Sequence, residues 1–238
     1  MVSLYMVFLM PVFAIIIVLG IVVVKVFRIK KEYKNSKYGA SSGNSLFRTI
    51  NDKGNHGEFL TFQYLEKLDA DNKILTNVYI PRSDGTTTEI DLLMLNKTGI
   101  YVFESKNYSG WIFGDEKSKN WTQTLEGGKK NKFYNPIWQN KTHITALKKV
   151  INDVNPNSFY SYIVFSERCE LKKVSVSGDN IAVVKRNKLY DLLKEDIESR
   201  SRVLSDEQLD RLFESLKKYT LADSNTKLQH IESIRNKA

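Results

Sequence analysis

A run of uncharged residues from Val2 to Val24 constrains this chain more than any other feature of its sequence. Folded as a helix, these 23 residues would extend about 34 Å, which exceeds the ~30 Å hydrocarbon core of a bilayer. Only Ser3, Pro11 and Gly20 interrupt the run, and membrane helices tolerate all three. The run therefore predicts a transmembrane anchor over residues 1–24, which contacts the membrane through residues 2–24.

A cleaved signal peptide is the alternative interpretation of this run. Such a peptide has a basic segment before its apolar core, a core of about 7–15 residues, and small residues at the cleavage site. Here no charged residue precedes the apolar run, and Lys25-Val26-Phe27 follows it. The sequence therefore favours an anchor that is retained.

Basic residues follow the apolar run directly. The segment Lys25–Lys37 holds six basic residues and one acid, Glu32, so it carries +5 of the net charge of +9. Because positive residues mark the cytoplasmic end of a membrane helix, we expect a single-pass protein of the cell membrane whose C-terminal domain is cytoplasmic. Such a cluster can also bind anionic lipid headgroups. The basic composition of the whole chain is accordingly weak support for nucleic-acid binding.

Composition divides the remaining chain into three parts. Residues 25–51 combine the basic cluster with small polar residues and are predicted to be a juxtamembrane segment and linker. A folded domain is expected over residues 52–200 and a helical extension over residues 201–238. In the extension, Ser205-Asp206-Glu207-Gln208 is a capping box that predicts a helix start. The polar tail from Ala222 is expected to fray.

Hydrophobic periodicity predicts both helices and strands in the folded part. The expected helices cover residues 57–68, 136–151, 189–197 and 205–218, and the expected strands cover residues 74–80, 86–95, 100–106, 161–166 and 181–185. Asn96-Lys97-Thr98-Gly99 is a turn that joins two of these strands into a hairpin. This order implies an α/β fold, in which a mixed β-sheet is flanked by helices and preceded by one transmembrane helix.

The hairpin carries charged residues in an apolar setting. Asp91 interrupts a run of large aliphatic residues, and Glu104 and Lys106 share one face at the end of an apolar strand. Charged groups in such a place are costly unless they are paired, bound to a metal or open to solvent. Asp91 and Glu104 on adjacent strands can share a divalent cation. Ser105 offers its backbone carbonyl as a further oxygen ligand, and Glu58 a third carboxylate.

These groups suit the hydrolysis of a phosphodiester bond. A divalent cation lowers the pKa of bound water and offsets charge on the phosphate. A lysine positions or deprotonates the water, or stabilises the developing charge. Three histidines cannot build a histidine-rich metal site, so the carboxylates favour Mg²⁺ or Mn²⁺ over zinc. The single cysteine, Cys169, excludes an intramolecular disulfide.

Asp91, Glu104 and Lys106 resemble the (P)D…(D/E)xK signature of the restriction-endonuclease-like nucleases, with Ile90 where the name of that superfamily expects proline. The surrounding segments over residues 52–165 resemble, in the same order, the nuclease-related (NERD) domain family. These segments are Gly57-Glu58-Phe59, Glu89-Ile90-Asp91, the stretch from Gly99 to Gly110, Trp121-Thr122-Gln123, and Asn135-Pro136-Ile137-Trp138-Gln139 followed by His143.

The resemblance implies a restriction-endonuclease-like core and Mg²⁺-dependent cleavage of nucleic acid, with DNA as the expected partner. It assigns the active site to Glu58, Asp91, Glu104 and Lys106. It also assigns Gln139, on the following helix, to contacting DNA or positioning the water. Restriction-endonuclease-like folds often act as dimers, so a homo-oligomer is an open prediction, although the sequence shows no interface.

Other interpretations of these residues stay open. Glu104 and Lys106 also suit a solvated edge-strand pair, Asp91 a strand end, Glu58 the first turn of a helix, and Gln139 a helix surface. Each of the remaining candidates also allows two interpretations. His143 is either a phosphate contact or a structural residue, the three tryptophans either stack on bases or belong to the core, and the lysines of residues 117–141 either follow phosphates or are solvated.

Two other functions also remain open, because a fold alone does not establish chemistry. The first is a non-catalytic module that binds nucleic acid or protein at the membrane. The second is a membrane scaffold whose C-terminal helices bind partners.

Overall fold

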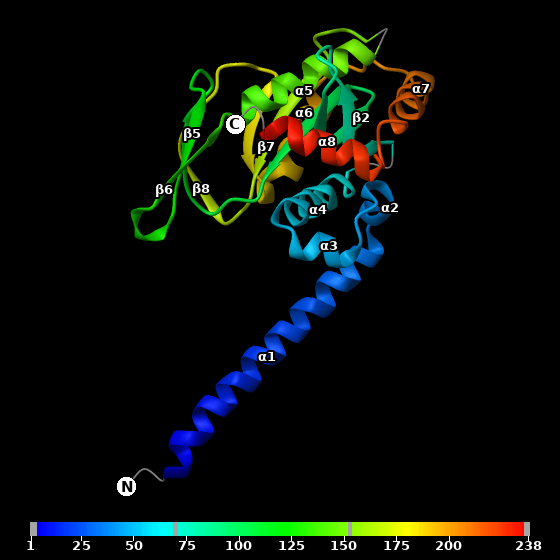
Figure 1. The fold of residues 1–238 in the computed structure, drawn as a ribbon. Coiled ribbons are helices and arrows are strands. Elements are labelled where there is room, and N and C mark those ends of the chain that lie inside the picture. Colours follow the sequence, from blue (N-terminus) through cyan, green and yellow to red (C-terminus); the bar gives the residue numbers. More distant parts are fainter. Residues whose placement is uncertain (1–3, 69–70, 152–153, 236–238) are drawn as a thin grey trace.

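The computed structural model describes residues 4–68, 71–151 and 154–235. Its first element is the helix α1 (Leu4–Asn35), which projects from the folded part as a stalk (Figure 1). The segment Pro11–Asn35 is the one helix among the described residues that is long and apolar enough to cross a membrane. None of its apolar window is buried, and a membrane anchor and a signal sequence both meet this criterion.

Three helices lead from α1 to the main sheet: α2 (Tyr38–Ser42), α3 (Leu46–Asn51) and α4 (Lys53–Leu65). The side chain of Tyr38 is fully buried, and its ring meets those of Phe59 and Phe62 at centroid distances of 5.4 and 5.5 Å. Residues 38–51, which belong to the predicted linker, therefore form helices that pack on the domain. Their small and polar composition did not reveal these long-range contacts.

The larger sheet has five strands in the order β1-β2-β3-β7-β9. Their bounds are Lys73–Pro81 for β1, Thr87–Asn96 for β2, Gly99–Lys106 for β3, Phe159–Phe165 for β7 and Ile181–Lys185 for β9. The first three strands pair antiparallel, whereas β3, β7 and β9 pair parallel. This mixed sheet and its flanking helices confirm the predicted fold class.

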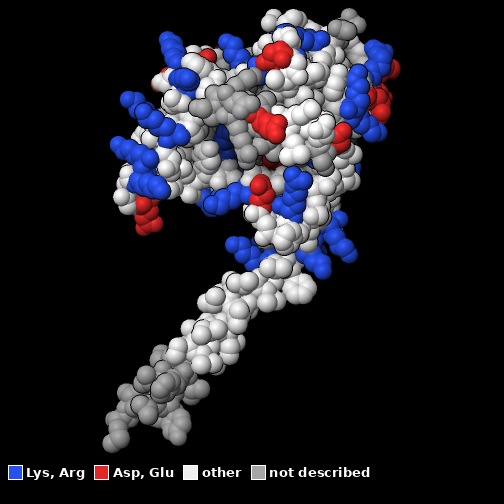
Figure 2. Space-filling model, viewed as in Figure 1, with Lys and Arg blue, Asp and Glu red and all other residues white. Residues whose placement is uncertain are grey.

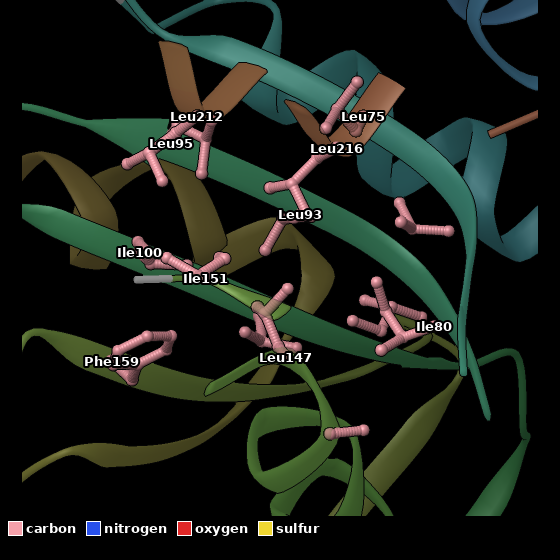
Figure 3. Packing of buried hydrophobic residues seen from close by; sticks show 14 of the residues in the cluster. Leu75, Ile80, Leu93, Leu95, Ile100, Leu147, Ile151, Phe159, Leu212 and Leu216 are labelled. Atoms are coloured by element: carbon pink, nitrogen blue, oxygen red, sulfur yellow. The ribbon is translucent and has the colours of Figure 1, made fainter. Parts of the chain in front are cut away.

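Helices cover both faces of the larger sheet. On one face lie α5 (Pro136–Val150) and α7 (Asp206–Lys217), and on the other lie α4 and α6 (Leu189–Ser199). Figure 3 shows Leu93 and Leu95 of β2 near Leu212 and Leu216 of α7, with Leu147 of α5 on the same face. Because alternate residues of a strand face opposite sides, Leu92 and Met94 instead pack toward α4 and α6.

A smaller sheet continues from the end of β3 in the order β6-β5-β4-β8. Its strands are β4 (Gly110–Asp115), β5 (Asn120–Thr124), β6 (Lys130–Tyr134) and β8 (Cys169–Ser175), with a 3₁₀ turn at Glu126–Gly128 between β5 and β6. Trp121 is fully buried here and stacks on Phe165 at 6.0 Å. Residues 107–132 are rich in Gly, Lys, Asn and Trp, which favours loops with short strands, in agreement with β4 and β5. The sequence did not indicate β8, because its exposed residues include two lysines and it has no continuous apolar run.

The C-terminal region is helical. Ser205 and Gln208 form both hydrogen bonds of the predicted capping box at the start of α7, which confirms that prediction. A 3₁₀ turn (Arg186–Lys188) precedes α6, and a further helix, α8 (Ser224–Arg235), follows α7. The buried ring of His230 in α8 meets Tyr79 of β1 edge-on at 5.6 Å. The expected fraying of the tail is therefore not what the structure shows for Ser224–Arg235.

Candidate active site

The pairing of β2 with β3 ends where the two candidate carboxylates begin. Leu92 and Phe103 form the last pair of the ladder, and the next residues along the two strands are Asp91 and Glu104. Beyond that pair, the backbone N–H of Ser105 donates a hydrogen bond of 2.8 Å to Oδ2 of Asp91. The fold thus brings both carboxylates to one end of the hairpin, as the sequence predicted.

Glu104 is the centre of a chain of contacts. Its side chain is only 2% exposed, and its Oε1 accepts a hydrogen bond of 2.6 Å from Nζ of Lys106. Its Oε2 lies 3.1 Å from Nε2 of His143, whose Nδ1 lies 2.7 Å from Oγ1 of Thr88. Nζ of Lys106 also donates to Oε1 of Gln139 at 3.1 Å. Residues from β2, β3 and α5 therefore hold Glu104 and Lys106 in one arrangement.

The environment favours opposite charges on Glu104 and Lys106. Burial alone would raise the pKa of Glu104, but Lys106 and His143 outweigh it and bring this pKa below its ordinary value. Burial alone would lower the pKa of Lys106, but the carboxylates of Glu104 and Asp91 outweigh it and raise this pKa. These contacts favour the cationic form of Lys106, which suits stabilisation of negative charge on a phosphate.

The pKa values of Asp91 and Glu58 are both raised, unlike that of Glu104. Burial, followed by the charges of Glu104 and Glu58, raises the pKa of Asp91 well above its ordinary value. Burial and the charge of Glu89 raise the pKa of Glu58 to about 8. Both shifts follow from burial and from neighbouring carboxyl groups, so the protein itself stabilises the ionised forms of Asp91 and Glu58 poorly.

Close packing of α4 on the end of β3 determines the position of Glu58. A Cβ atom added to Gly57 would lie 2.8 Å from Cβ of Asn107, so the approach of this helix requires glycine. One turn further, Oγ1 of Thr61 lies 3.2 Å from Oγ of Ser105. Oη of Tyr38 in turn donates to a carboxylate oxygen of Glu58 at 3.3 Å. Glu58 thus approaches from the face of the sheet opposite to α5.

The candidate site lies in a segment that matches a known protein family. Residues 53–166 match the nuclease-related domain, and this span contains all five predicted side chains of the site. The chain belongs to the nuclease-related domain family. Its general fold is of the PD-(D/E)xK kind. An uncharacterized protein of Bacillus anthracis is 34% identical over 187 residues, which are 78% of this chain and 85% of the relative. No solved structure gave a significant match.

The donor atoms of this nuclease-related domain suit a hard divalent cation. Asp91, Glu104 and Glu58 offer only oxygen atoms, and the raised pKa values of Asp91 and Glu58 show that the protein alone stabilises their ionised forms poorly, which a bound cation would reverse. The two contacts to Glu104 occupy about half of the roughly four acceptor positions of a carboxylate. Within the described ranges, however, no three Asp, Glu, His or Cys side chains form a ready metal-binding group. Water and the backbone carbonyl of Ser105 would have to complete the coordination.

Gln139 and His143, the remaining candidates of the nuclease-related domain, have different surroundings. Gln139 contacts Lys106 directly, in agreement with its predicted place in the site. His143 is only 4% exposed and lies between Glu104 and Thr88, so it positions Glu104 and does not reach out to a phosphate. Sequence reasoning missed Thr88 and Tyr38, because neither belongs to a motif. The only sequence feature that could have indicated Thr88 is that it is a hydroxyl residue three positions before Asp91.

The tryptophans of the nuclease-related domain also differ from one another. Trp121 belongs to the core, and the half-buried Trp138 donates from Nε1 to the carbonyl oxygen of Glu116 at 2.8 Å. Trp111 is 52% exposed, and Nζ of Lys172 lies 5.2 Å from the centroid of its ring. Base stacking by Trp121 is therefore excluded, whereas Trp111 presents an accessible ring.

A hollow of about 370 Å³ lies along the outer side of α5, next to the helix face that carries Gln139. Its lining combines three cationic residues, two aromatic residues and several hydroxyl groups, and includes Arg82, Tyr134, Trp138, Lys141 and Lys149. Arg82 is paired with Asp84 at 3.6 Å. Lys141 and Lys149 form no ion pair with a carboxylate in the part of the chain that the structure describes.

Proposed function

We propose that this protein is a membrane-anchored nuclease that hydrolyses phosphodiester bonds in DNA and depends on Mg²⁺ or Mn²⁺. The observation that carries the proposal is the contact of Lys106 with Glu104 at the point where β2 and β3 stop pairing, beside Asp91. Membership of the nuclease-related domain family supports a nuclease-related function. Titratable groups with strongly shifted pKa values, such as Asp91 and Glu58 here, cluster at functional sites.

In this proposal, Asp91 and Glu104 hold the divalent cation, with Glu58 as a third carboxylate nearby. The chemistry that the cation supplies is a bound water of lowered pKa and a charge that offsets the phosphate. Lys106 remains protonated and places its positive charge beside the phosphate, where negative charge develops during hydrolysis. Gln139 orients the ammonium group of Lys106 through its Oε1 atom.

His143 and Thr88 act one step away from the reacting atoms. Their contacts fix the orientation of the Glu104 carboxylate, so that Lys106 and a cation meet it in a constant geometry. Such supporting contacts matter because a catalytic group that is displaced by about 1 Å loses much of its effect. We therefore assign His143 and Thr88 as positioning residues.

The hollow beside α5 supports nucleic acid as the substrate. The ammonium groups of Lys141 and Lys149, which lack carboxylate partners among the described residues, suit phosphate groups. Tyr134 is 46% exposed and meets Trp138 edge-on at 6.2 Å, so an unpaired base can stack at this wall. Binding here would bring the strand along α5 toward Gln139.

The apolar stalk supports the anchoring part of the proposal. In this account the apolar part of α1 crosses the membrane, and the basic segment Lys25–Lys37, which includes the end of α1, lies on the cytoplasmic side. The nuclease-related domain would then act on DNA in the cytoplasm, next to the membrane. A homo-oligomer stays a prediction of the resemblance and has no further support here.

Cleavage assays with the full chain, reconstituted into lipid nanodiscs, test the proposal. Linear, circular and single-stranded DNA are incubated with Mg²⁺, Mn²⁺ or EDTA. Wild type is compared with Glu104→Gln and with Glu195→Gln, an isosteric control at an exposed position on α6. We expect metal-dependent cleavage by wild type and Glu195→Gln, and none by Glu104→Gln. DNA binding without cleavage under every condition would instead establish a binding module, and absence of both would favour a scaffold.

A further inference from the structure

The stalk is joined firmly to the domain. α1 continues without a break to Asn35, and Oη of Tyr33 donates a hydrogen bond to the backbone carbonyl of Asn44, just before α3. The ring of Tyr33 also meets that of Phe59 at 5.8 Å. Because no flexible linker intervenes, the position of α1 determines which surface of the domain faces the membrane.

The helix α3, which begins beside this junction, presents an apolar surface to solvent. Phe47 is 77% exposed and Ile50 is 36% exposed, whereas Thr49 of the same helix is fully buried. Arg48 lies between the two apolar residues in the sequence and is exposed as well. Exposed apolar side chains next to a basic residue are the combination of groups that membrane interfaces bind.

The height of α3 along α1 agrees with this interpretation. Phe27 lies three residues beyond the apolar run, between Lys25 and Arg28, and is 67% exposed. Tyr33, which holds α3 through Asn44, is six residues further, a rise of about 9 Å. The headgroup layer adds about 5–8 Å to each side of the hydrocarbon core, and membrane helices tilt by about 20° on average. On this scale Tyr33 lies just outside the headgroup layer, and Figure 1 shows α3 on the side of the domain from which α1 projects.

The charges at this junction suit an anionic membrane surface. The segment Lys25–Lys37 holds six basic residues, and its one acid, Glu32, pairs with Arg28 at 2.8 Å. Arg48 and Lys53 add two exposed cationic residues from the domain. Figure 2 shows Lys and Arg side chains gathered where the stalk meets the domain. Basic residues this close to an anionic surface are attracted to its phosphate groups.

We propose that α3 docks into the anionic headgroup layer of the membrane that α1 spans, with Phe47 and Ile50 inserted at the interface and Arg48 and Lys53 contacting lipid phosphates. This docking fixes the orientation of the domain relative to the membrane. The inference rests on the membrane insertion of α1 proposed above, and it does not depend on cleavage.

A fluorescent label on Ile50 tests this docking. The only native cysteine, Cys169, is 2% exposed, so an environment-sensitive dye such as NBD will react selectively with an introduced Ile50→Cys. The labelled full chain is placed in nanodiscs that contain phosphatidylglycerol and lipids with a spin-label quencher. Two reference positions are used: Val18→Cys within α1, and Asn157→Cys in the loop between α5 and β7, which Figure 1 shows on the side of the domain remote from α1.

We expect blue-shifted and quenched emission from positions 50 and 18, and neither effect from position 157. Quenching at position 50 should weaken in pure phosphatidylcholine, and it should fall to the level of position 157 when Phe47→Glu is added. Quenching at position 18 without quenching at position 50 would overturn the docking and leave the anchor intact. Absence of quenching at position 18 would overturn both. Cleavage of DNA by the same samples is scored separately.

Discussion

Nζ of Lys106 lies 2.6 Å from Oε1 of Glu104 and 3.1 Å from Oε1 of Gln139, so one ammonium group joins the end of β3 to α5. In the proposed mechanism this ammonium stabilises charge on the phosphate. Replacing Lys106 with Met keeps the length of the side chain and removes its charge. We expect Lys106→Met to lower kcat by about 10²-fold or more, as loss of a transition-state donor does.

Steady-state cleavage rates check this effect, and fluorescence anisotropy with labelled DNA in EDTA checks that substrate binding persists. Lys194→Met, at an exposed position on α6, is the matched control. If Lys106→Met binds less DNA but cleaves the bound DNA at the normal rate, Lys106 is a binding residue and not a catalytic one.

His143→Ala tests the positioning of Glu104. The variant removes the partner of Oε2 of Glu104 and leaves Lys106 in place. We expect a loss of about 10–100-fold in apparent metal affinity or activity, as for other residues that orient a metal ligand. The Mg²⁺ concentration at half-maximal rate should rise. Thr88→Val, which removes only the contact to Nδ1 of His143, should act in the same direction and more weakly. An unchanged Mg²⁺ dependence in His143→Ala would contradict the positioning role.

The raised pKa of Glu58 makes the free energy of unfolding depend on pH. Burial raises the pKa of Glu58 from its ordinary 4.5 to about 8, so between these values the folded protein binds a proton that the unfolded chain has lost. The stability that this group contributes is fully present below about pH 4.5 and is lost as the pH rises toward 8. Glu58→Gln cannot ionise and escapes this loss.

Thermal unfolding in EDTA at pH 5, 6, 7 and 8 checks this relation. The melting temperature of wild type should fall with pH relative to that of Glu58→Gln, and the gap should be largest at pH 8. Because Asp91 also has a raised pKa, part of the decline should remain in the variant. Added Mg²⁺ should narrow the gap, since a bound cation offsets the ionised carboxylates. A gap that does not change with pH would contradict the assignment.

The hollow along α5 predicts a salt-dependent effect on DNA binding. Replacing both Lys141 and Lys149 with Glu removes two candidate phosphate contacts. The slope of log K against log salt should decrease in magnitude by about 1–2, because each contact contributes about 0.7–0.9. A control with Lys188 and Lys194, both exposed and distant in sequence from α5, receives the same two charge changes. Equal slopes for the two double variants would place the DNA elsewhere.

The sequence was sufficient to predict the hairpin that carries the candidate site, because the signal there is local. Asp91, Glu104 and Lys106 stand out as charged residues in apolar strands, and the turn between the strands sets their register. Gln139 required the family resemblance, since its contact with Lys106 spans 33 residues. The capping box of α7 was likewise readable, because all of its atoms come from four consecutive residues.

The features that the sequence did not reveal depend on distant partners. The composition of residues 38–51 is that of a linker, but the ring of Tyr38 is buried against Phe59 and Phe62. The polar tail forms α8, whose His230 packs against Tyr79, a residue 151 positions away. Periodicity and composition report local preference, and neither contains these tertiary contacts.

The rate of DNA cleavage during a Mg²⁺ titration tests the central claim most directly. The full chain in nanodiscs is compared as wild type, Asp91→Asn and the surface control Glu195→Gln, with EDTA to return each sample to zero metal. The account predicts a saturable, EDTA-reversible rate for wild type and Glu195→Gln, and no detectable rate for Asp91→Asn at any Mg²⁺ concentration. Cleavage that persists in EDTA, or an Asp91→Asn variant as fast as wild type, would contradict a metal-dependent site at Asp91 and Glu104.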